Sequence, residues 1–563
     1  MKKYFYKKSR ISLVVCLLFV AFSCETTDLD INDNPNQLTV DQADPSFILN
    51  GIQFSLVGQH FGLSATTRGT MRQVHQFGSY AQGSGPGALN GAWTAVYSIG
   101  NNRRLLQEIG QTSELRTHVG IAKVIEAFAY VNLVDYLGSA VYTEALNSVE
   151  FPQPNFDSGE SIYDAMYAQL NDAITDLSAQ DQLQAEDLFF NGDNSKWIKL
   201  ANTLKIKMYV QTKLVTNAAA LADLNAIIAS GNFIVDSSDD FFARFNANAV
   251  NPDTRHPDFV GQYLVNAGGQ YMSNDFMNTL LRGKSIEDPR LRYYIYRQDL
   301  NTPSGDKLPC EGEAGFQYCY IGNGYWGRDH ADDEGIPNDG ADRATFGIYP
   351  AGGAYDDARS IGVIEAEAVA TYDPSSGLTL AEYTAQLLSS ENPATAESSN
   401  LGGAGIHPMI LSSFTHFMLA EAALPAPQGL GATGDSRGLL SVGMQQSFDL
   451  VADFAGIAMD ATAVSAYIAE VLAEYDAASS DQKLEIIIRE YYIALWGNGI
   501  ETYNNYRRTG YPELGFSVIS NTDFPRSFFI PENELNANDN PDLVQKELTD
   551  QLFWDTNPAG FID

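Results

Sequence analysis

The chain has 563 residues and is strongly acidic, with 34 Lys and Arg residues against 70 Asp and Glu residues and a formal net charge of −36. Such a surface repels phosphate backbones and anionic headgroups, so nucleic acid is a poor partner, whereas neutral sugars, peptides and cations remain compatible with it. The length and apolar content are sufficient for one large core or several domains, and no clear linker divides the sequence.

The N-terminal residues predict export from the cytoplasm. Five basic residues precede an apolar run from Ile11 to Phe22 that is too short to span a bilayer as a helix, which indicates a secretory signal peptide over residues 1–23. Cys24 directly follows Ser23, and this arrangement is typical of lipoprotein processing. We therefore expect Cys24 to carry lipid, residues 24–44 to form a lipidated tether, and the protein to meet the membrane only through that anchor. The alternative is ordinary cleavage nearby that leaves Cys24 free.

The remaining cysteines form an even pair. Cys16 would leave with the signal peptide and Cys24 would take lipid, which leaves Cys310 and Cys319 in an oxidising compartment. We expect a local disulfide between them, and the alternative is two buried free thiols.

Helical periodicity dominates the rest of the chain. The clearest helix starts at Asp157, whose side chain can cap it while Glu160 reaches back, and continues to Leu177 with one apolar face. The same spacing predicts further helices over residues 45–61, 92–109, 115–136, 196–214, 410–424 and 482–496. Trp93 and Trp197 fall on apolar helical faces, so we expect both in the core.

Two sections lack helical periodicity. Residues 250–401 and 66–90 are rich in glycine and turn-forming residues, and long ordered loops of this kind commonly carry binding sites. Pairs of helices separated by turns elsewhere suggest a tetratricopeptide-like solenoid, although no strict 34-residue period is visible.

Several segments, in a fixed order along almost the whole chain, are similar to those of one family. They are DNPN at 33–36, LVDYLG at 133–138, NFDS at 155–158, KWIKLANTL at 196–204, DPR at 288–290, FMLAEA at 417–422 and YRRTGYP at 506–512. Together they resemble the SusD/RagB family of SusD-like outer-membrane nutrient-binding lipoproteins.

The resemblance implies a mainly α fold, in which tetratricopeptide-like helix pairs form a right-handed solenoid that packs against a loop-rich irregular half with little β structure. We expect one SusD-like domain over residues 45–563, with helical halves at 45–249 and 402–563 and a loop-rich, ligand-side insertion at 250–401. The resemblance also implies a surface-exposed outer-membrane lipoprotein. It would bind a nutrient such as an oligosaccharide, deliver it to a TonB-dependent, SusC-like transporter, break no bonds and need no cofactor.

One loop carries the residues best suited to bind a sugar. Aromatic rings suit the C–H face of a sugar and polar groups suit its rim, so Tyr320, Tyr325, Trp326, Arg328 and His330 are candidate ligand-binding residues. Four residues of the earlier loop are expected to face the same ligand; they are Arg68, Arg72, His75 and Tyr80. The alternative is an aromatic minicore under a long loop.

Acidic and basic clusters leave further alternatives open. Asp329, Asp332, Asp333 and Glu334 could supply oxygens to Ca²⁺, but their spacing matches no recognised ligand set. Arg507 and Arg508 could grip an anionic ligand, although we favour a structural role in which an arginine pairs with a carboxylate such as Glu501.

No catalytic residue can be named from the sequence. A secreted glycoside hydrolase is the first alternative function. Such an enzyme needs two carboxyl groups about 5 to 10 Å apart, and the 70 acidic residues offer many candidates for that pair. A structural subunit of the surface complex without its own ligand is the second.

Overall fold

Apolar residues at helical spacing become the buried faces of long helices. In the helix Gly159–Leu177, the residues Ile162, Met166, Leu170, Ala173 and Leu177 are all buried. Its cap differs from the expected one, because the Ser158 side chain accepts the Ser161 N–H. Asp157 is occupied elsewhere and accepts the backbone N–H groups of Tyr142 and Thr143, both at 2.9 Å.

The computed structural model describes residues 44–110, 115–179, 183–265, 270–282, 284–304, 308, 319–332, 342–391, 400–515, 517–519 and 523–562. The signal peptide and the tether with Cys24 lie outside these residues, as does Cys310; Cys319 is disulfide-bonded. Among the described residues, no helix combines the length and apolar character that crossing a bilayer requires. Pro45–Asp563 is one compact unit.

The principal helices are α2 (Pro45–Thr70), α3 (Tyr80–Gly83), α4 (Asn90–Gly110), α5 (Arg116–Leu137), α6 (Gly159–Leu177), α7 (Asn194–Gln211), α8 (Ala218–Ser230), α14 (Ser412–Ala422), α15 (Ser436–Ala455), α16 (Ala461–Ala477), α17 (Ser480–Ala494) and α18 (Gly499–Thr509). We call these helices the helical body. Residues 250–401, the loop-rich region, contain α9 (Pro257–Phe259), the π-helix η3 (Val260–Val265), α10 (Asn274–Leu281), α11 (Leu291–Tyr294), α12 (Ile361–Thr371) and α13 (Leu380–Glu391).

Strands are short and pair in twos. β1 (Ser139–Ala140) pairs with β2 (Asp157–Ser158), β3 (Phe241–Arg244) with β6 (Ile406–Ile410), and β4 (Ile295–Tyr296) with β5 (Thr345–Phe346), all antiparallel. The β3–β6 pair joins the two edges of the loop-rich region, since its strands lie just before and just after that region.

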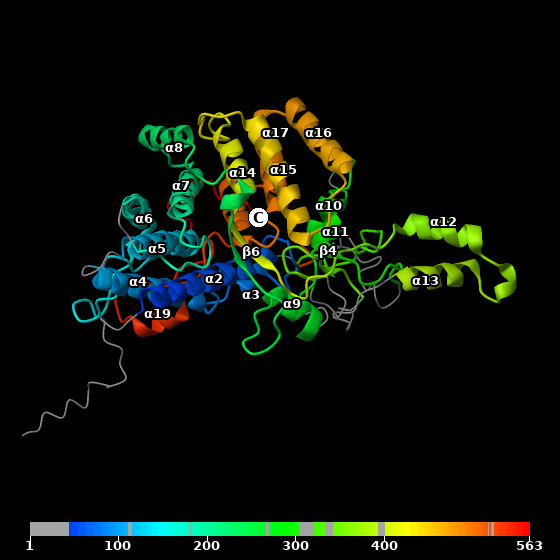
Figure 1. Ribbon diagram of the computed structural model, residues 1–563, viewed down its shortest axis with the longest axis horizontal. Coiled ribbons are helices and arrows are strands. Elements are labelled where there is room, and N and C mark those ends of the chain that lie inside the picture. The colour runs from blue at the N-terminus through cyan, green and yellow to red at the C-terminus, as the bar shows by residue number, and fades with distance from the viewer. Residues whose placement is uncertain are drawn as a thin grey trace, which may run out of the picture. The chain divides into compact units, whose positions relative to one another are not determined.

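Consecutive helices of the body pack on one another (Figure 1). α2 packs against α4, α4 against α5, α5 against α6, α6 against α7 and α7 against α8, and α14 then contacts both α7 and α15. Trp93 is 6% exposed and Trp197 is fully buried, as predicted. These contacts confirm the predicted mainly α fold of helix pairs with little β structure.

Buried ion pairs tie the helices of the body together. Lys207 of α7 lies between Asp135 of α5 at 3.1 Å and Glu501 of α18 at 3.2 Å. Arg508 of α18 binds both carboxylate oxygens of Glu421 of α14, and Lys213 approaches the same carboxylate at 2.8 Å. Burial alone raises the pKa of Glu421, but Arg508 and Lys213 hold it below its ordinary value.

The pair Arg507 and Arg508 therefore has the structural role that we favoured, with a different partner from the one expected. Glu501 pairs with Lys207, whereas Arg508 pairs with Glu421. Arg507 donates to the backbone oxygens of Arg526 and Asp135, and its guanidinium lies 3.7 Å from the centre of the Tyr503 ring. Neither guanidinium is exposed to a ligand.

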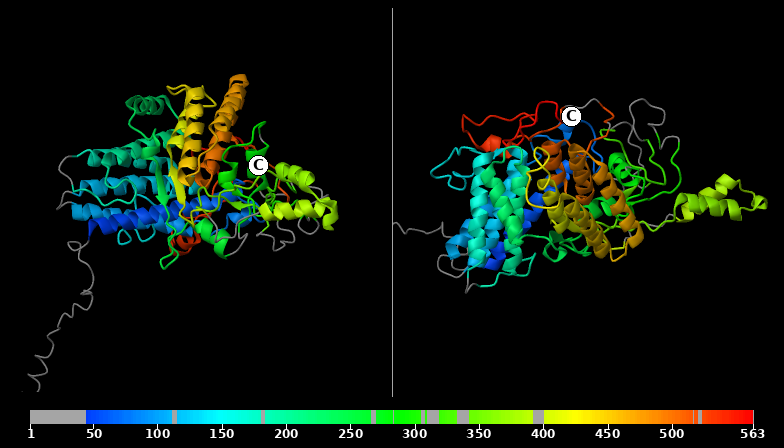
Figure 2. Two further views of the ribbon diagram at one scale, coloured as in Figure 1. Left: turned by 45° about the vertical axis from the view of Figure 1, so that its right-hand side comes forward. Right: turned by 90° about the horizontal axis from the view of Figure 1, so that it is seen from above.

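Two parts of the chain depart from the expected division. Helices α12 and α13 lie within the loop-rich region and form a hairpin that projects from the rest of the molecule (Figure 2). The described residues after Thr509 are irregular apart from α19 (Glu532–Ala537). Five prolines in this last segment, at positions 512, 525, 531, 541 and 558, remove backbone donors that a longer helix would need.

Candidate functional site

A hollow of about 430 Å³ lies where the segment after α2 meets the start of the loop-rich region. We call it the Phe77 hollow, and its lining residues are His75, Phe77, Pro257, Asp258, Gly261, Gln262 and Gln270. The backbone holds the two segments together, because the His75 N–H donates to the Tyr271 carbonyl at 2.9 Å and Val74 forms a bridge with Met272. A further bridge joins Ser273 to Arg328, which brings a third segment to the same place.

A stack of rings and guanidinium groups lies against this hollow. The His75 and Phe77 rings meet edge to face at 4.5 Å, and Phe77 lies 6.1 Å from Tyr271. Arg328 covers the Tyr271 ring at 4.5 Å. Arg343 lies 5.5 Å from the Tyr271 ring and 4.2 Å from the Trp326 ring. We call these side chains the aromatic platform.

Only the Phe77 end of the platform is open. Phe77 is 37% exposed, whereas His75, Tyr271, Trp326 and Arg328 are each at most 5% exposed. The buried rings and guanidinium groups thus support the Phe77 ring, which is the exposed apolar face of the platform.

Another part of the lining is polar. Both Asp258 oxygens accept from Arg68, at 2.6 and 2.9 Å, and Arg68 projects from the last turn of α2. Burial raises the pKa of Asp258, but Arg68 outweighs this effect and holds the pKa below its ordinary value. Gln262 and Gln270 add amide groups beside this carboxylate.

The structure brings the two loops that we expected to share a ligand into contact, but most of the predicted side chains are buried. Of the nine candidates, His75 lines the Phe77 hollow, Arg68 holds Asp258, and Trp326 and Arg328 lie within the platform. Trp326 is 3% exposed, so it supports the platform from within.

A second group of candidates does not line the hollow. His330 lies 5.0 Å from the Tyr80 ring, and Arg72 donates to the Tyr80 hydroxyl at 3.3 Å and to Asp275 at 3.1 Å. Burial, with smaller contributions from Arg72 and His75, lowers the pKa of His330 to about 2. These residues form a minicore of the kind that we kept as the alternative.

Tyr320 and Tyr325 also have structural partners. The Tyr325 ring is buried with the Arg297 guanidinium 5.1 Å from its centre, and the Tyr320 hydroxyl accepts the Gly324 N–H at 2.9 Å. Neither tyrosine lines the hollow, and their role in ligand binding stays a prediction.

The predicted cation site is described in part. Asp329 accepts from the Asn274 amide at 2.7 Å and Asp332 pairs with Arg328 at 3.1 Å, while Asp333 and Glu334 lie outside the described residues. Within the described part of the chain, no three potential metal-ligating side chains gather into a cluster. The calcium hypothesis stays a prediction.

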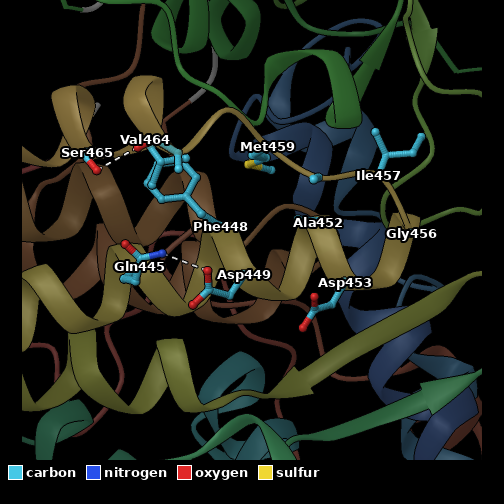
Figure 3. Close-up of a pocket in the computed structure, with 12 residues that line it drawn as sticks. Gln445, Phe448, Asp449, Ala452, Asp453, Gly456, Ile457, Met459, Val464 and Ser465 are labelled. Carbon is cyan, nitrogen blue, oxygen red and sulfur yellow. Dashed lines mark hydrogen bonds between the residues drawn. The ribbon is translucent and has the colours of Figure 1, made fainter.

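A larger hollow of about 530 Å³ lies between α15 and α16 (Figure 3). Its lining includes Phe448 and Met459 together with the polar side chains of Gln445 and Asp449, and the Gln445 amide donates to Asp449 at 2.8 Å. Phe448, the aromatic ring among its lining residues, is buried, so this hollow presents no open ring face to a sugar, unlike the Phe77 hollow.

A comparison with known families identifies the family of this chain. A family model described as starch-binding and associating with the outer membrane matches residues 35–311 and 361–531. The chain belongs to this SusD-like family. No curated protein sequence matches it.

Solved structures agree with this assignment of the fold. A chitin-binding protein is 20% identical with a TM-score of 0.62, and the match covers 91% of this chain and 100% of that one. A chitin-binding SusD homolog from Flavobacterium johnsoniae is 17% identical with a TM-score of 0.61 and coverage of 91% and 99%. A SusD homolog from Bacteroides fragilis is 17% identical with a TM-score of 0.57 and coverage of 88% and 94%.

The lining of the Phe77 hollow lies within the matched part of this SusD-like chain, whereas part of the aromatic platform does not. His75, Phe77, Asp258 and Gln262 lie in the part that matches the family model, whereas Trp326, Arg328 and Arg343 lie between its two matched segments. The inner half of the platform thus comes from residues that the family model does not describe.

Sequence analysis missed several residues of the hollow. Phe77 lies two positions after His75, a candidate, but nothing local distinguishes an exposed phenylalanine from a buried one. Asp258, Gln262 and Gln270 belong to a segment without helical periodicity. They line one hollow with His75 only because the two segments meet, as the contact between the His75 and Tyr271 rings shows.

Proposed function

We propose that this SusD-like protein captures an oligosaccharide in the Phe77 hollow and delivers it to a TonB-dependent, SusC-like transporter without breaking a bond. The exposed Phe77 ring beside the amides of Gln262 and Gln270 carries the proposal. A sugar presents an apolar C–H face to a ring and hydroxyl groups to amides, so this pairing of groups suits it.

The family supports the same chemistry and the same location. Its description names starch binding and association with the outer membrane, and two similar structures are chitin-binding proteins. We propose that Cys24 provides a lipid anchor on the outer membrane and that the body is exposed at the cell surface.

The carboxylate content of the hollow supports binding without hydrolysis. Glycoside hydrolases use two carboxyl groups that flank the scissile bond, about 5 to 10 Å apart. Asp258 is the one carboxylate among the described lining residues, and both of its oxygens are engaged by Arg68.

Calorimetry with a matched pair of variants tests the proposal. The chain from residue 25 onward is titrated with panels of malto-, cello- and chito-oligosaccharides and of peptides, and each mixture is analysed for products. Binding should be lost in Phe77→Ala and kept in Phe54→Ala, because Phe54 is 68% exposed on α2 and does not line the hollow.

Each other outcome contradicts a named part of the proposal. Release of shorter sugars would make the protein an enzyme, and equal binding by both variants would remove the hollow as the site. Absence of binding across all panels would favour a structural subunit of the surface complex. For delivery, cells that express only Phe77→Ala should take up the sugar no better than cells without the chain.

A further inference from the structure

Gln262 is an unusual group in the wall of the Phe77 hollow. It belongs to the π-helix η3, a rare conformation that occurs frequently at functional sites. Its side chain is 6% exposed, and its carbonyl oxygen is buried without a hydrogen-bond partner in the described parts of the chain. A buried acceptor without a donor destabilises a fold, so its retention beside a hollow points to a donor that arrives with a ligand.

The carboxylate in the wall is already in use. Both Asp258 oxygens accept from Arg68, whereas the Gln262 carbonyl accepts from no group among the described residues. Pro257, Gly261 and the Phe77 ring line the same hollow and offer apolar contacts. A matching ligand group would present a hydrogen-bond donor together with a small apolar substituent.

We propose that Gln262 recognises the acetamido group of a 2-acetamido sugar, which narrows the class of oligosaccharide and rests on the function proposed above. The acetamido N–H would donate to the Gln262 carbonyl, and the acetamido oxygen would accept from the Gln262 amide N–H₂, because a glutamine offers both groups. The acetamido methyl group would contact Phe77 or Pro257. A hydroxyl group in the same place lacks both the methyl group and the carbonyl.

Two sugars with the same backbone test this inference. Chitohexaose and cellohexaose are both β-1,4-linked glucopyranose chains and differ at C2, where one carries an acetamido group and the other a hydroxyl. We expect chitohexaose to bind the wild-type chain about 10- to 100-fold more tightly, the range of one or two neutral hydrogen bonds.

A variant then assigns the preference to Gln262. Gln262→Leu keeps a similar volume and removes both polar groups, so it should bind the two sugars within about threefold of each other. Gln270→Leu is the matched control at another lining amide; it should weaken the binding of both sugars by the same factor and so retain the preference. Because Gln262→Leu removes an unpaired buried acceptor, its melting temperature should equal or exceed that of the wild type, which separates a loss of recognition from a loss of folding.

The outcomes distinguish the two proposals. Equal affinity of the wild-type chain for both sugars would overturn acetamido recognition while leaving oligosaccharide capture intact. A preference that survives in Gln262→Leu would overturn the role of Gln262. Failure of the wild-type chain to bind any sugar in the panels would overturn the proposed function itself.

Discussion

Arg508 of the helical body and Arg343 of the loop-rich region bury their guanidinium groups in different ways. In the body, Arg508 is surrounded by hydrogen-bond acceptors from three other side chains, Glu421, Gln211 and Asn505. In the loop-rich region, Arg343 lies 4.2 Å from the Trp326 ring and 5.5 Å from the Tyr271 ring. The first arrangement fixes the distances between helices, whereas the second builds a layered surface whose outermost ring, Phe77, remains open. Arg508 thus supports the packing of helices, whereas Arg343 supports the ring layer beneath the proposed binding surface.

Removing one charge from the body should have the largest effect. Glu421→Gln leaves Arg508 and Lys213 buried without their carboxylate, so we expect the free energy of unfolding to fall by about 3–5 kcal/mol in a urea titration. Arg437→Gln is the control, because Arg437 and its partner Asp476 are about half exposed, and it should cost at most about 1 kcal/mol. Similar losses in both variants would contradict the role assigned to the buried cluster.

A buried carboxyl at the edge of the body gives the next largest effect. Burial raises the pKa of Asp240 to about 7, and its Oδ1 accepts the Ser412 N–H at the start of α14. The folded state therefore holds a proton that the unfolded state has lost, and wild-type stability should fall as the pH rises from about 4 through 7. Asp240→Asn keeps the acceptor and removes the charge, so at pH 8 it should exceed the wild type by about 2–4 kcal/mol in chemical unfolding. A pH-independent difference between the two would refute this explanation.

A histidine of the loop-rich region should show the opposite sign. Burial lowers the pKa of His330 to about 2, so only the unfolded state takes up a proton near pH 6.5, and wild-type stability falls as the pH drops below that value. His330→Phe preserves the packing on Tyr80 without a titrating group. Its stability relative to the wild type should rise by about 1.4 kcal/mol between pH 7.5 and 5.5. A difference in stability between variant and wild type that stays constant over this pH range in thermal unfolding would contradict the lowered pKa of His330.

Truncation at the open edge of the platform should have the smallest effect on stability. Phe77→Ala removes a ring that is 37% exposed, so we expect a change of less than about 1 kcal/mol in the free energy of unfolding despite the loss of sugar binding. Trp326→Ala, at the buried end, should cost about 3–5 kcal/mol. If Phe77→Ala were equally costly, Phe77 would belong to the core and the hollow would lose its binding surface.

The sequence predicts α2, α4, α5, α6, α7, α14 and α17, whose apolar residues recur at regular spacing, but it does not predict α8, α15, α16 or α18. Helix α18 shows where this fails. Asn504, Asn505, Arg507 and Arg508 make it polar, yet all are buried, because partners on α5 and α14 lie far away in the sequence. Spacing alone cannot reveal such a helix.

The candidate site was predicted at the level of loops and not of side chains. Glycine-rich composition identified both segments that meet at the hollow. Composition cannot tell that Trp326 is covered by Arg343 while Phe77 stays open, because the difference depends on contacts between distant residues, such as Phe77 and Tyr271. Aromatic residues in a loop indicate that a platform exists, and tertiary contacts decide which ring a ligand would touch.

Helix α2 sets the distance between Pro45 and Arg68. It begins at Pro45, where the described body starts, and carries Arg68, which holds the acidic wall of the hollow, near its other end. An α-helix rises about 1.5 Å per residue, so about 35 Å of rigid rod separates these two points. One turn more or fewer in this helix would therefore shift the Arg68–Asp258 pair by about 5.4 Å relative to Pro45.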